Sequence, residues 1–286
     1  MLSMGKWMTQ RLTSWLNKEP AVDPSVPSLT NYERLCDEIR PGDVLLIEGR
    51  SRASNIIKKL TQSTWTHSAL YIGNYYQLNL AGIAPHALVN YSRTPHTNLI
   101  IEAVLGQGTI VTPLSKYRQA HIRLCRPRSL TLTDRNAVIK HALDKLGYQY
   151  DIRHLIDLAR FLLPYSLLPR RWLSSLFEFK PGKPTQTICS SMLAEAFMSV
   201  HYPVLPIISH TEDGIRFYKR NIKLFTPKDF DYSPYFDIIK YPFVGLDELA
   251  TYRSLPWDQE GLICNDAGDC VVPFQDLDKD SHQKGE

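Results

Sequence analysis

One cysteine of this chain stands where a nucleophile would gain reactivity. Cys189 falls in the stretch TQTICSSMLAEAF (185–197), just ahead of apolar residues that recur at the three- and four-residue steps of a helix. The unpaired N–H groups and the dipole at a helix N-terminus lower the pKa of a cysteine and stabilise a developing oxyanion. The alternative is that Cys189 is a small buried hydrophobe, the first core residue of that helix.

A histidine and a glutamate are candidates for the two partners that a cysteine nucleophile needs. His67 opens the strand-like segment HSALYIG (67–73), and alternation places it on one face with Ala69, whose small side chain lets a helix bring Cys189 against the imidazole. Glu102 interrupts the apolar run LIIEAVL, where a buried carboxylate requires a partner. If the two strands are neighbours, His67 is that partner and the set is nucleophile, base and orienting group. Otherwise, each side chain points into solvent.

The elements that must position these residues are short strands followed by helices. Strands are expected at 44–47, 67–73, 98–106, 108–114, 120–126 and 236–240, with Gly and Pro at the turns and a long 75–97 loop. A short basic helix is expected over 51–63. The clearest helix covers 132–147, with Thr133 as N-cap and Gly147 as its stop. This order predicts an α+β fold in which an antiparallel sheet packs against helices.

Composition and charge exclude several classes of protein. The chain has 286 residues, 43% apolar and 22% charged, which is typical of a globular protein. A net charge of +4 without a basic stripe interleaved with aromatics argues against a nucleic-acid partner. The five cysteines show no zinc spacing, so the sequence predicts neither a metal nor a cofactor. The closest pair, Cys264 and Cys270, either closes a small disulfide loop or stays reduced.

Two segments bear on a contact with membranes. No stretch is long and apolar enough to span a bilayer, and the N-terminus lacks a signal core, so we expect a cytoplasmic protein. Residues 1–18 place Trp, Met and Leu at helical spacing among basic residues, which fits either an interfacial membrane helix or an ordinary docked helix. The apolar, basic 151–179 segment is either a lid or lipid-facing surface, or two short core helices.

Several motifs resemble a known family. RPGDVLLIEG, THSALYIG, IEAV, LGYQYD, ICSSMLAEAF and FTPKDFDYSPYF, in this order, are similar to the YiiX/YebB-like branch of the NlpC-type cysteine hydrolases. These are circularly permuted papain-like enzymes in which His precedes Cys along the chain. The resemblance runs from about residue 38 to 242 and implies a permuted papain-like domain with its nucleophile at a helix N-terminus.

The resemblance also implies roles for single residues. Cys189 would be the nucleophile, His67 the base and Glu102 the polar third member. The expected pocket residues are Tyr148, Tyr150 and Asp151, from a Tyr-Asp segment near the site, and Ser190. Ser190 and Ser191 depart from the commoner Ser-Glu after the cysteine, and Glu195 is a candidate for part of that role.

The sequence thus predicts a hydrolase or acyltransferase that attacks an amide, peptide, ester or thioester carbonyl. The 151–179 segment favours an amphipathic or lipid-linked acyl substrate and peripheral membrane contact. The rival hypothesis is a non-catalytic, membrane-associated binding module with a vestigial site. The expected domains are an N-terminal helix and linker (1–30), the hydrolase domain (31–245) with a helical insert at 151–180, and a partly disordered C-terminal extension (246–286).

Overall fold

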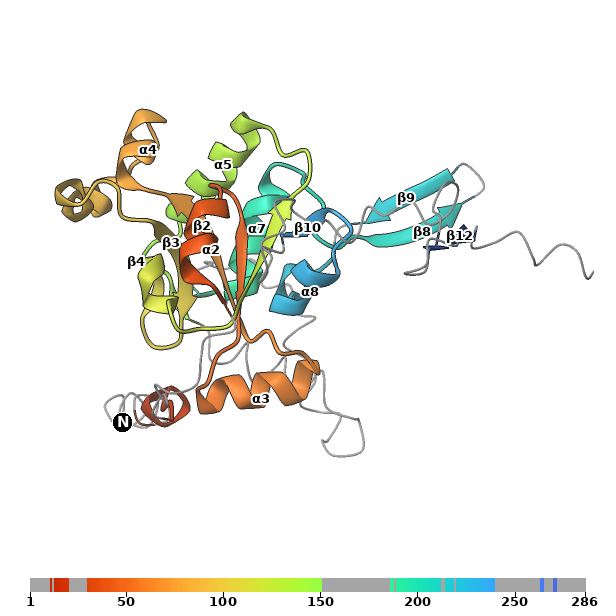
Figure 1. Cartoon of the computed structure of the whole chain (residues 1–286), viewed down its shortest axis with the longest axis horizontal. Coiled ribbons are helices and arrows are strands. Elements are labelled where there is room, and N and C mark those ends of the chain that lie inside the picture. The colour runs from red at the N-terminus through yellow and green to blue at the C-terminus, as the bar shows by residue number, and fades with distance from the viewer. Residues whose placement is uncertain are drawn as a thin grey trace, which may run out of the picture.

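A six-stranded sheet forms the centre of the molecule (Figure 1). This computed structural model describes residues 11, 13–20, 30–150, 186–187, 189–211, 214–218, 220–239, 263–264 and 270–271. The sheet has the strand order β10-β5-β1-β2-β3-β4 and consists of β1 (Val44–Ile47), β2 (His67–Gly73), β3 (Leu99–Val104), β4 (Gly108–Pro113), β5 (Ile122–Pro127) and β10 (Phe236–Ile239). Every neighbouring pair is antiparallel, which confirms the predicted α+β class.

Helices cover both faces of this sheet. The α-helices are α2 (Tyr32–Glu38), α3 (Arg52–Thr61), α4 (Tyr75–Leu80), α5 (Leu132–Leu143), α7 (Cys189–Ser199) and α8 (Pro227–Tyr232); the 3-10 helices are η1 (His86–Arg93), η2 (Leu114–Tyr117) and η5 (Ile222–Leu224). Helix α2 packs Leu35 onto one face of the sheet, while α5, α7 and α8 pack onto the other. Helix α3 lies across one end of the strands (Figure 1).

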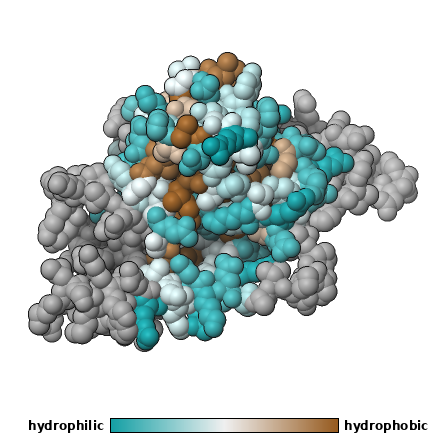
Figure 2. All heavy atoms as spheres, turned by 90° about the vertical axis from the view of Figure 1, so that its left-hand side faces the viewer, coloured by the Kyte–Doolittle hydropathy of each residue, from teal (hydrophilic) through white to brown (hydrophobic). Residues whose placement is uncertain are grey.

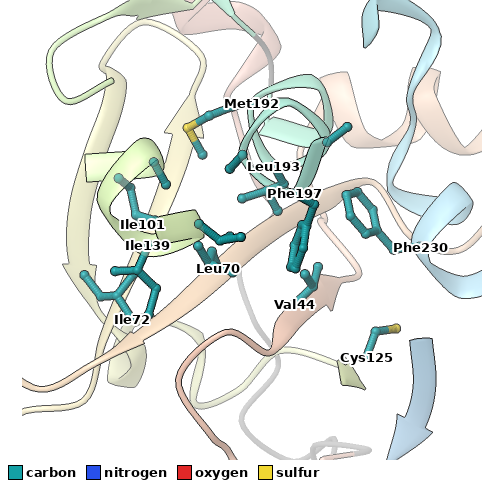
Figure 3. Packing of buried hydrophobic residues seen from close by; sticks show 14 of the residues in the cluster. Val44, Leu70, Ile72, Ile101, Cys125, Ile139, Met192, Leu193, Phe197 and Phe230 are labelled. Atoms are coloured by element: carbon teal, nitrogen blue, oxygen red, sulfur yellow. The ribbon is translucent and has the colours of Figure 1, made fainter. Parts of the chain in front are cut away.

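The main core lies between the sheet and α7. Met192, Leu193 and Phe197 of this helix point toward Leu70 and Val44 of the sheet (Figure 3), and all five side chains are fully buried. Burial of each such side chain stabilises the fold by about 1.5–3 kcal/mol. This apolar contact fixes the direction of α7 and therefore the position of its first residue, Cys189.

The side of the sheet on which α7 packs differs from the prediction. We expected α7 to approach over Ala69, on the same strand face as His67. Instead, it packs over Leu70 and Ile72, and Ala69 contributes to the core under α2. The large apolar face attracts the helix because it buries more surface than a single methyl group does. His67 meets α7 because it is the first residue of β2, at the end of the strand.

Two further expectations about local structure were wrong. The N-cap of α5 is Thr131, whose side chain accepts a hydrogen bond from the Asp134 N–H, and Thr133 lies inside the helix. The 75–97 connection is not an irregular loop, since it contains α4 and η1. Helix α4 begins with a capping box in which Asn74 and Gln77 each accept from the other's backbone N–H.

Three small strand pairs complete the described structure. They are β6 (Gln149–Tyr150) with β7 (Gln186–Thr187), β8 (Ile207–Thr211) with β9 (Gly214–Tyr218), and β11 (Ile263–Cys264) with β12 (Cys270–Val271). The first pair is parallel and the other two are antiparallel. The predicted insert at 151–180 lies outside the described residues, and the predicted domain boundaries stay predictions.

The surface is of mixed polarity. Seen from the side of α4 and the edge strand β4, apolar atoms reach the surface among hydrophilic ones (Figure 2), and Leu80 and Val89 are exposed. At the lower end of this view, the coloured residues are mainly hydrophilic (Figure 2). Among the described residues, no helix is long and apolar enough to cross a membrane.

Candidate active site

The sheet opens between β2 and β3 at the end where His67 lies. The two strands pair from Gly73 opposite Leu99 to Leu70 opposite Ile101, and the pairing stops there. Each strand nevertheless continues, β2 back to His67 and β3 on to Val104. Helix α7 contacts both strands, and its first residue, Cys189, interacts with His67, so the start of α7 lies at the end where they separate. The backbone N–H and C=O groups that would pair if the sheet were closed are therefore directed toward the start of α7.

His67 and Glu102 meet across this opening. The imidazole Nε2 lies 2.6 Å from Glu102 Oε2, and the carboxylate is fully buried. An acceptor at this distance holds the ring in the tautomer whose Nε2 carries hydrogen. The other ring nitrogen, Nδ1, is then the one that can face a sulfur.

Glu102 accepts three more hydrogen bonds, from side chains that the sequence analysis did not single out. Tyr117 donates its hydroxyl to Oε2 at 2.6 Å. Thr112 donates its hydroxyl to Oε1 at 2.7 Å, and the Lys116 ammonium donates to the same oxygen at 2.8 Å. Both carboxylate oxygens are thus saturated, as a buried carboxylate requires.

Cys189 lies buried at the start of α7, only 5% exposed, and close enough to the His67 imidazole that each group shifts the pKa of the other. Ser68 is the second group at the sulfur. Its hydroxyl is buried and has no hydrogen-bond partner of ordinary geometry, and its N–H and hydroxyl both lower the pKa of Cys189.

The direction of the Ser68 N–H follows from the strand pattern. The Tyr71 N–H donates across to Asp43 of the β1 side, and amides alternate in direction along an antiparallel strand. The Ser68 N–H therefore points toward β3, where pairing has stopped, and it is available to the sulfur.

The ionisable groups of the site shift one another's pKa values in a consistent sense. Burial would raise the pKa of Cys189, but the charge and hydrogen bond of His67, followed by the hydrogen bonds of Ser68, outweigh it and lower that pKa. Burial would lower the pKa of His67, but the charge and hydrogen bond of Cys189, together with Glu102, raise it to about 10. Both shifts favour the charged pair, a thiolate on Cys189 and an imidazolium on His67.

The carboxylate and the tyrosine beside it follow the same logic. Burial would raise the pKa of Glu102, but hydrogen bonds and charges from His67 and Lys116 hold it well below its usual range. Burial, followed by the charge of Glu102, raises the pKa of Tyr117, so the phenol stays protonated and donates. In the charge states that these shifts favour, thiolate, imidazolium, carboxylate and ammonium alternate in sign from Cys189 through His67 and Glu102 to Lys116.

Tyr148 and Tyr150, two of the remaining predicted residues, have contacts of their own outside this line. Tyr148 is half-buried, its carbonyl accepts from the Thr109 N–H, and its ring lies under the Lys145 ammonium. Tyr150 pairs with Thr187, two residues before Cys189. The polypeptide therefore brings the tyrosine segment beside the strand that leads into the nucleophile. Asp151 lies outside the described residues.

Ser190 and Glu195 point away from the reacting pair. The Ser190 hydroxyl donates to the Phe225 carbonyl at 2.7 Å, and a contact with substrate stays a prediction for it. Glu195 binds Lys145 of the segment after α5 at 2.7 Å, an ion pair that ties α7 to its neighbour. Within the described ranges, no cluster of three or more His, Cys, Asp or Glu has the arrangement of a metal site.

Comparisons with known proteins bear on the family of this chain. Residues 38–160 match the model of a family described as permuted papain-like amidase enzyme, YaeF/YiiX, C92 family. The matched residues include His67 and Glu102 and end before Cys189. A similar solved structure is that of metalloprotein yiiX from Escherichia coli O157:H7, at 15% identity and a TM-score of 0.44, covering 71% of this chain and 97% of that one. A search of curated proteins found no significant match. Over residues 38–160, the family model confirms the resemblance to the YiiX-like permuted papain-like family.

Proposed function

We propose that this chain, a thiol hydrolase of the YiiX-like permuted papain-like family, works through a Cys189–His67–Glu102 triad and an acyl-enzyme intermediate. The observation that carries the proposal is the succession of contacts from the Cys189 sulfur to the imidazole and from the imidazole to a saturated, buried carboxylate. A histidine serving only to pack the core would need neither a cysteine at one nitrogen nor a charged carboxylate at the other.

The reaction begins from the ion pair. The Cys189 thiolate attacks the substrate carbonyl carbon, a C–S bond forms, and the carbonyl electrons move onto oxygen. The N–H groups at the start of α7 stabilise that oxyanion. As the tetrahedral intermediate collapses, His67 gives its proton to the leaving nitrogen, oxygen or sulfur, and the acyl group remains on Cys189.

Release of the acyl group uses the same imidazole as a base. Neutral His67 takes a proton from water, or from another acceptor, which attacks the thioester carbon and restores the thiolate and the imidazolium. Amide, peptide, ester and thioester substrates all satisfy this sequence, and the choice of water or another acceptor separates a hydrolase from an acyltransferase. We expect the enzyme in the cytoplasm.

The proposal is tested by labelling with an acyl-type activity probe and locating the label by mass spectrometry. Cys189→Ala should lose the label while keeping the unfolding transition of the wild type, because the side chain removed is small. His67→Ala should keep Cys189 but react far more slowly near pH 7, because its thiol loses the cation that ionises it. Undiminished labelling in either variant contradicts the triad. Membrane binding without any reactivity at Cys189 would favour the rival binding module.

A further inference from the structure

A strongly basic surface lies at the same end of the sheet as the candidate active site. It consists of the helical turn at 13–16 with the residues up to 20, and of α3 with its flanks, and it is called the basic platform here. Residues 11–20 and 48–66 together hold six Lys or Arg and two acids, Glu19 and Glu48, a surplus of four positive charges. Glu48 pairs with Lys58 at 2.6 Å, and the rest of the platform keeps its positive charge.

The outer face of α3 combines this charge with apolar surface. Arg52, Asn55, Ile56 and Lys59 are all exposed and are spaced as one stripe along the helix. Ile56 is 42% exposed, and beside the stripe Trp15 is 53% exposed with the Arg52 guanidinium 4.7 Å from the centre of its ring. An exposed tryptophan and isoleucine framed by basic side chains is the arrangement of interfacial membrane helices.

The platform is attached firmly to the rest of the domain. Leu16 packs with Ala53 of α3 and with Leu105 in a small buried cluster, and Asn17 donates its side-chain amide to the Leu105 carbonyl at 2.9 Å. Lys228 of α8 donates to the Thr61 carbonyl at the last residue of α3. The stripe is therefore held in one orientation relative to the sheet.

The same attachments bring the platform close to the reacting groups. Leu105 comes three residues after Glu102, and the Gly49 N–H donates to the hydroxyl of Thr66, which directly precedes His67. Helix α3 thus lies at the end of the sheet where β2 and β3 separate, so a flat surface bound to its outer face would lie at that end too (Figure 1).

We propose that the basic platform docks this protein on an anionic lipid bilayer, with Arg52 and Lys59 at the headgroups and Trp15 and Ile56 in the interface. Charge complementarity selects an anionic surface, and the aliphatic Ile56 favours lipid over a nucleic acid, whose bases stack on aromatic rings. Docking itself does not depend on catalysis. If the proposed function also holds, it favours acyl substrates that are presented at a membrane surface.

The test is co-sedimentation of the full chain with vesicles of phosphatidylcholine, with and without about 30% phosphatidylserine, at low and high salt. Binding is expected only to the anionic vesicles and should weaken with salt. Each basic side chain near such a surface strengthens binding by about fivefold, so Arg52→Gln with Lys59→Gln should weaken it about 25-fold. The matched control is Arg93→Gln with Lys140→Gln, which removes the same charge from exposed positions of η1 and α5 and should leave binding unchanged.

Further arms separate this proposal from its alternatives and from the proposed function. Ile56→Gln should weaken binding to anionic vesicles while leaving its salt dependence unchanged, because it removes apolar contact without removing charge. Cys189→Ala should bind as the wild type does, so loss of catalysis and loss of docking are distinguishable. The proposal is overturned by an absence of binding to anionic vesicles, by equal losses in the platform and control pairs, or by a platform that binds an RNA oligonucleotide and not vesicles.

Discussion

Replacement of Glu102 by Gln is the sharpest test of how the imidazole is held. The two Glu102 oxygens accept from four donors, His67 and Tyr117 at one oxygen and Thr112 and Lys116 at the other. Lys116 carries no acceptor, so the Gln carbonyl must remain on its side and the Gln NH₂ must face Tyr117 and His67. The Tyr117 hydroxyl can accept from that NH₂.

The imidazole can accept from the new NH₂ only by changing its protonation. Nε2 must give up its hydrogen to present a lone pair, and the neutral ring then carries its proton on Nδ1, toward the sulfur. In this tautomer His67 cannot take the Cys189 proton. The variant therefore keeps the shape of the site and loses its base, while the thiolate loses the cation that stabilises it.

The size of the effect follows from the charges involved. A charge at contact distance shifts the pKa of its neighbour by about one to three units, so the pH at which half of Cys189 is ionised should rise by that amount. Below the midpoint, the alkylation rate then falls by roughly 10- to 1000-fold, tenfold for each unit. Turnover of an acyl substrate should fall by about 10²–10⁴-fold, the contribution of a positioned general base.

The assay is the rate of iodoacetamide alkylation at each cysteine peptide between pH 5 and 9. Cys36 is half-buried on α2 and serves as an internal control, since its rate should not change. Lys116→Met should move the Cys189 midpoint the opposite way, because an uncompensated carboxylate holds the imidazolium more strongly. The reasoning is refuted if the pH midpoint of Cys189 rises equally in Glu102→Gln and Lys116→Met. It is also refuted if the midpoint is unchanged in a folded Glu102→Gln protein.

Two further predictions concern stability. Phe197→Ala should lower the free energy of unfolding by about 3–5 kcal/mol in urea titrations, because this buried ring packs edge-on against Phe236 at 5.2 Å. Exposed Leu132→Ala is its control and should change little. The pKa of Glu102 is lowered by folding, so its stabilisation is present above the unfolded value of about 4.3 and is lost as pH falls. The difference in free energy of unfolding between wild type and Glu102→Gln should therefore shrink below about pH 5. A difference that stays constant with pH would contradict the lowered pKa of Glu102.

The sheet was largely predictable because its strands carry local signals. The bounds predicted for the first two strands, 44–47 and 67–73, agree with β1 and β2. In both, apolar runs end at Gly, Pro or polar residues, which are signals within a few positions along the chain. Helix α4 was missed because its signal is a reciprocal pair of side-chain caps, and the Asn74-to-Gln77 spacing is common in loops as well.

The candidate site was predictable only in part, since its two halves depend on different kinds of information. Cys189, His67 and Glu102 stand out as a cysteine, a histidine and a glutamate in otherwise apolar settings, so residue type alone selects them. Lys116 and Tyr117 are an ordinary lysine and tyrosine in sequence. Their role depends on η2, the turn after β4 that carries them back over Glu102, and nothing local marks that direction.

Thr112 shows how register supplies the missing information. It pairs with Ile100, which makes it the diagonal neighbour of Glu102 on the same face of β3 and β4. A shift of one residue in this pairing would turn the Thr112 hydroxyl to the opposite face. The hydrogen bond from the Thr112 hydroxyl to Glu102 therefore depends on the register of the hairpin, which the residue type alone does not predict.

The alternation of charge along the site explains why these accessory residues matter to the nucleophile. A buried carboxylate beside a histidine is costly unless its own charge is compensated. Lys116 supplies that compensation, and because its side chain is 39% exposed it keeps contact with solvent while Glu102 does not. Without the Lys116 ammonium, the buried charge of Glu102 would lower the stability of the fold. Without the Glu102 carboxylate, the His67 imidazolium would lose its stabilising partner, and the Cys189 thiolate would then lose the imidazolium. The reactivity of Cys189 thus depends on a lysine three contacts away, delivered by the hairpin that also fixes the register of β3.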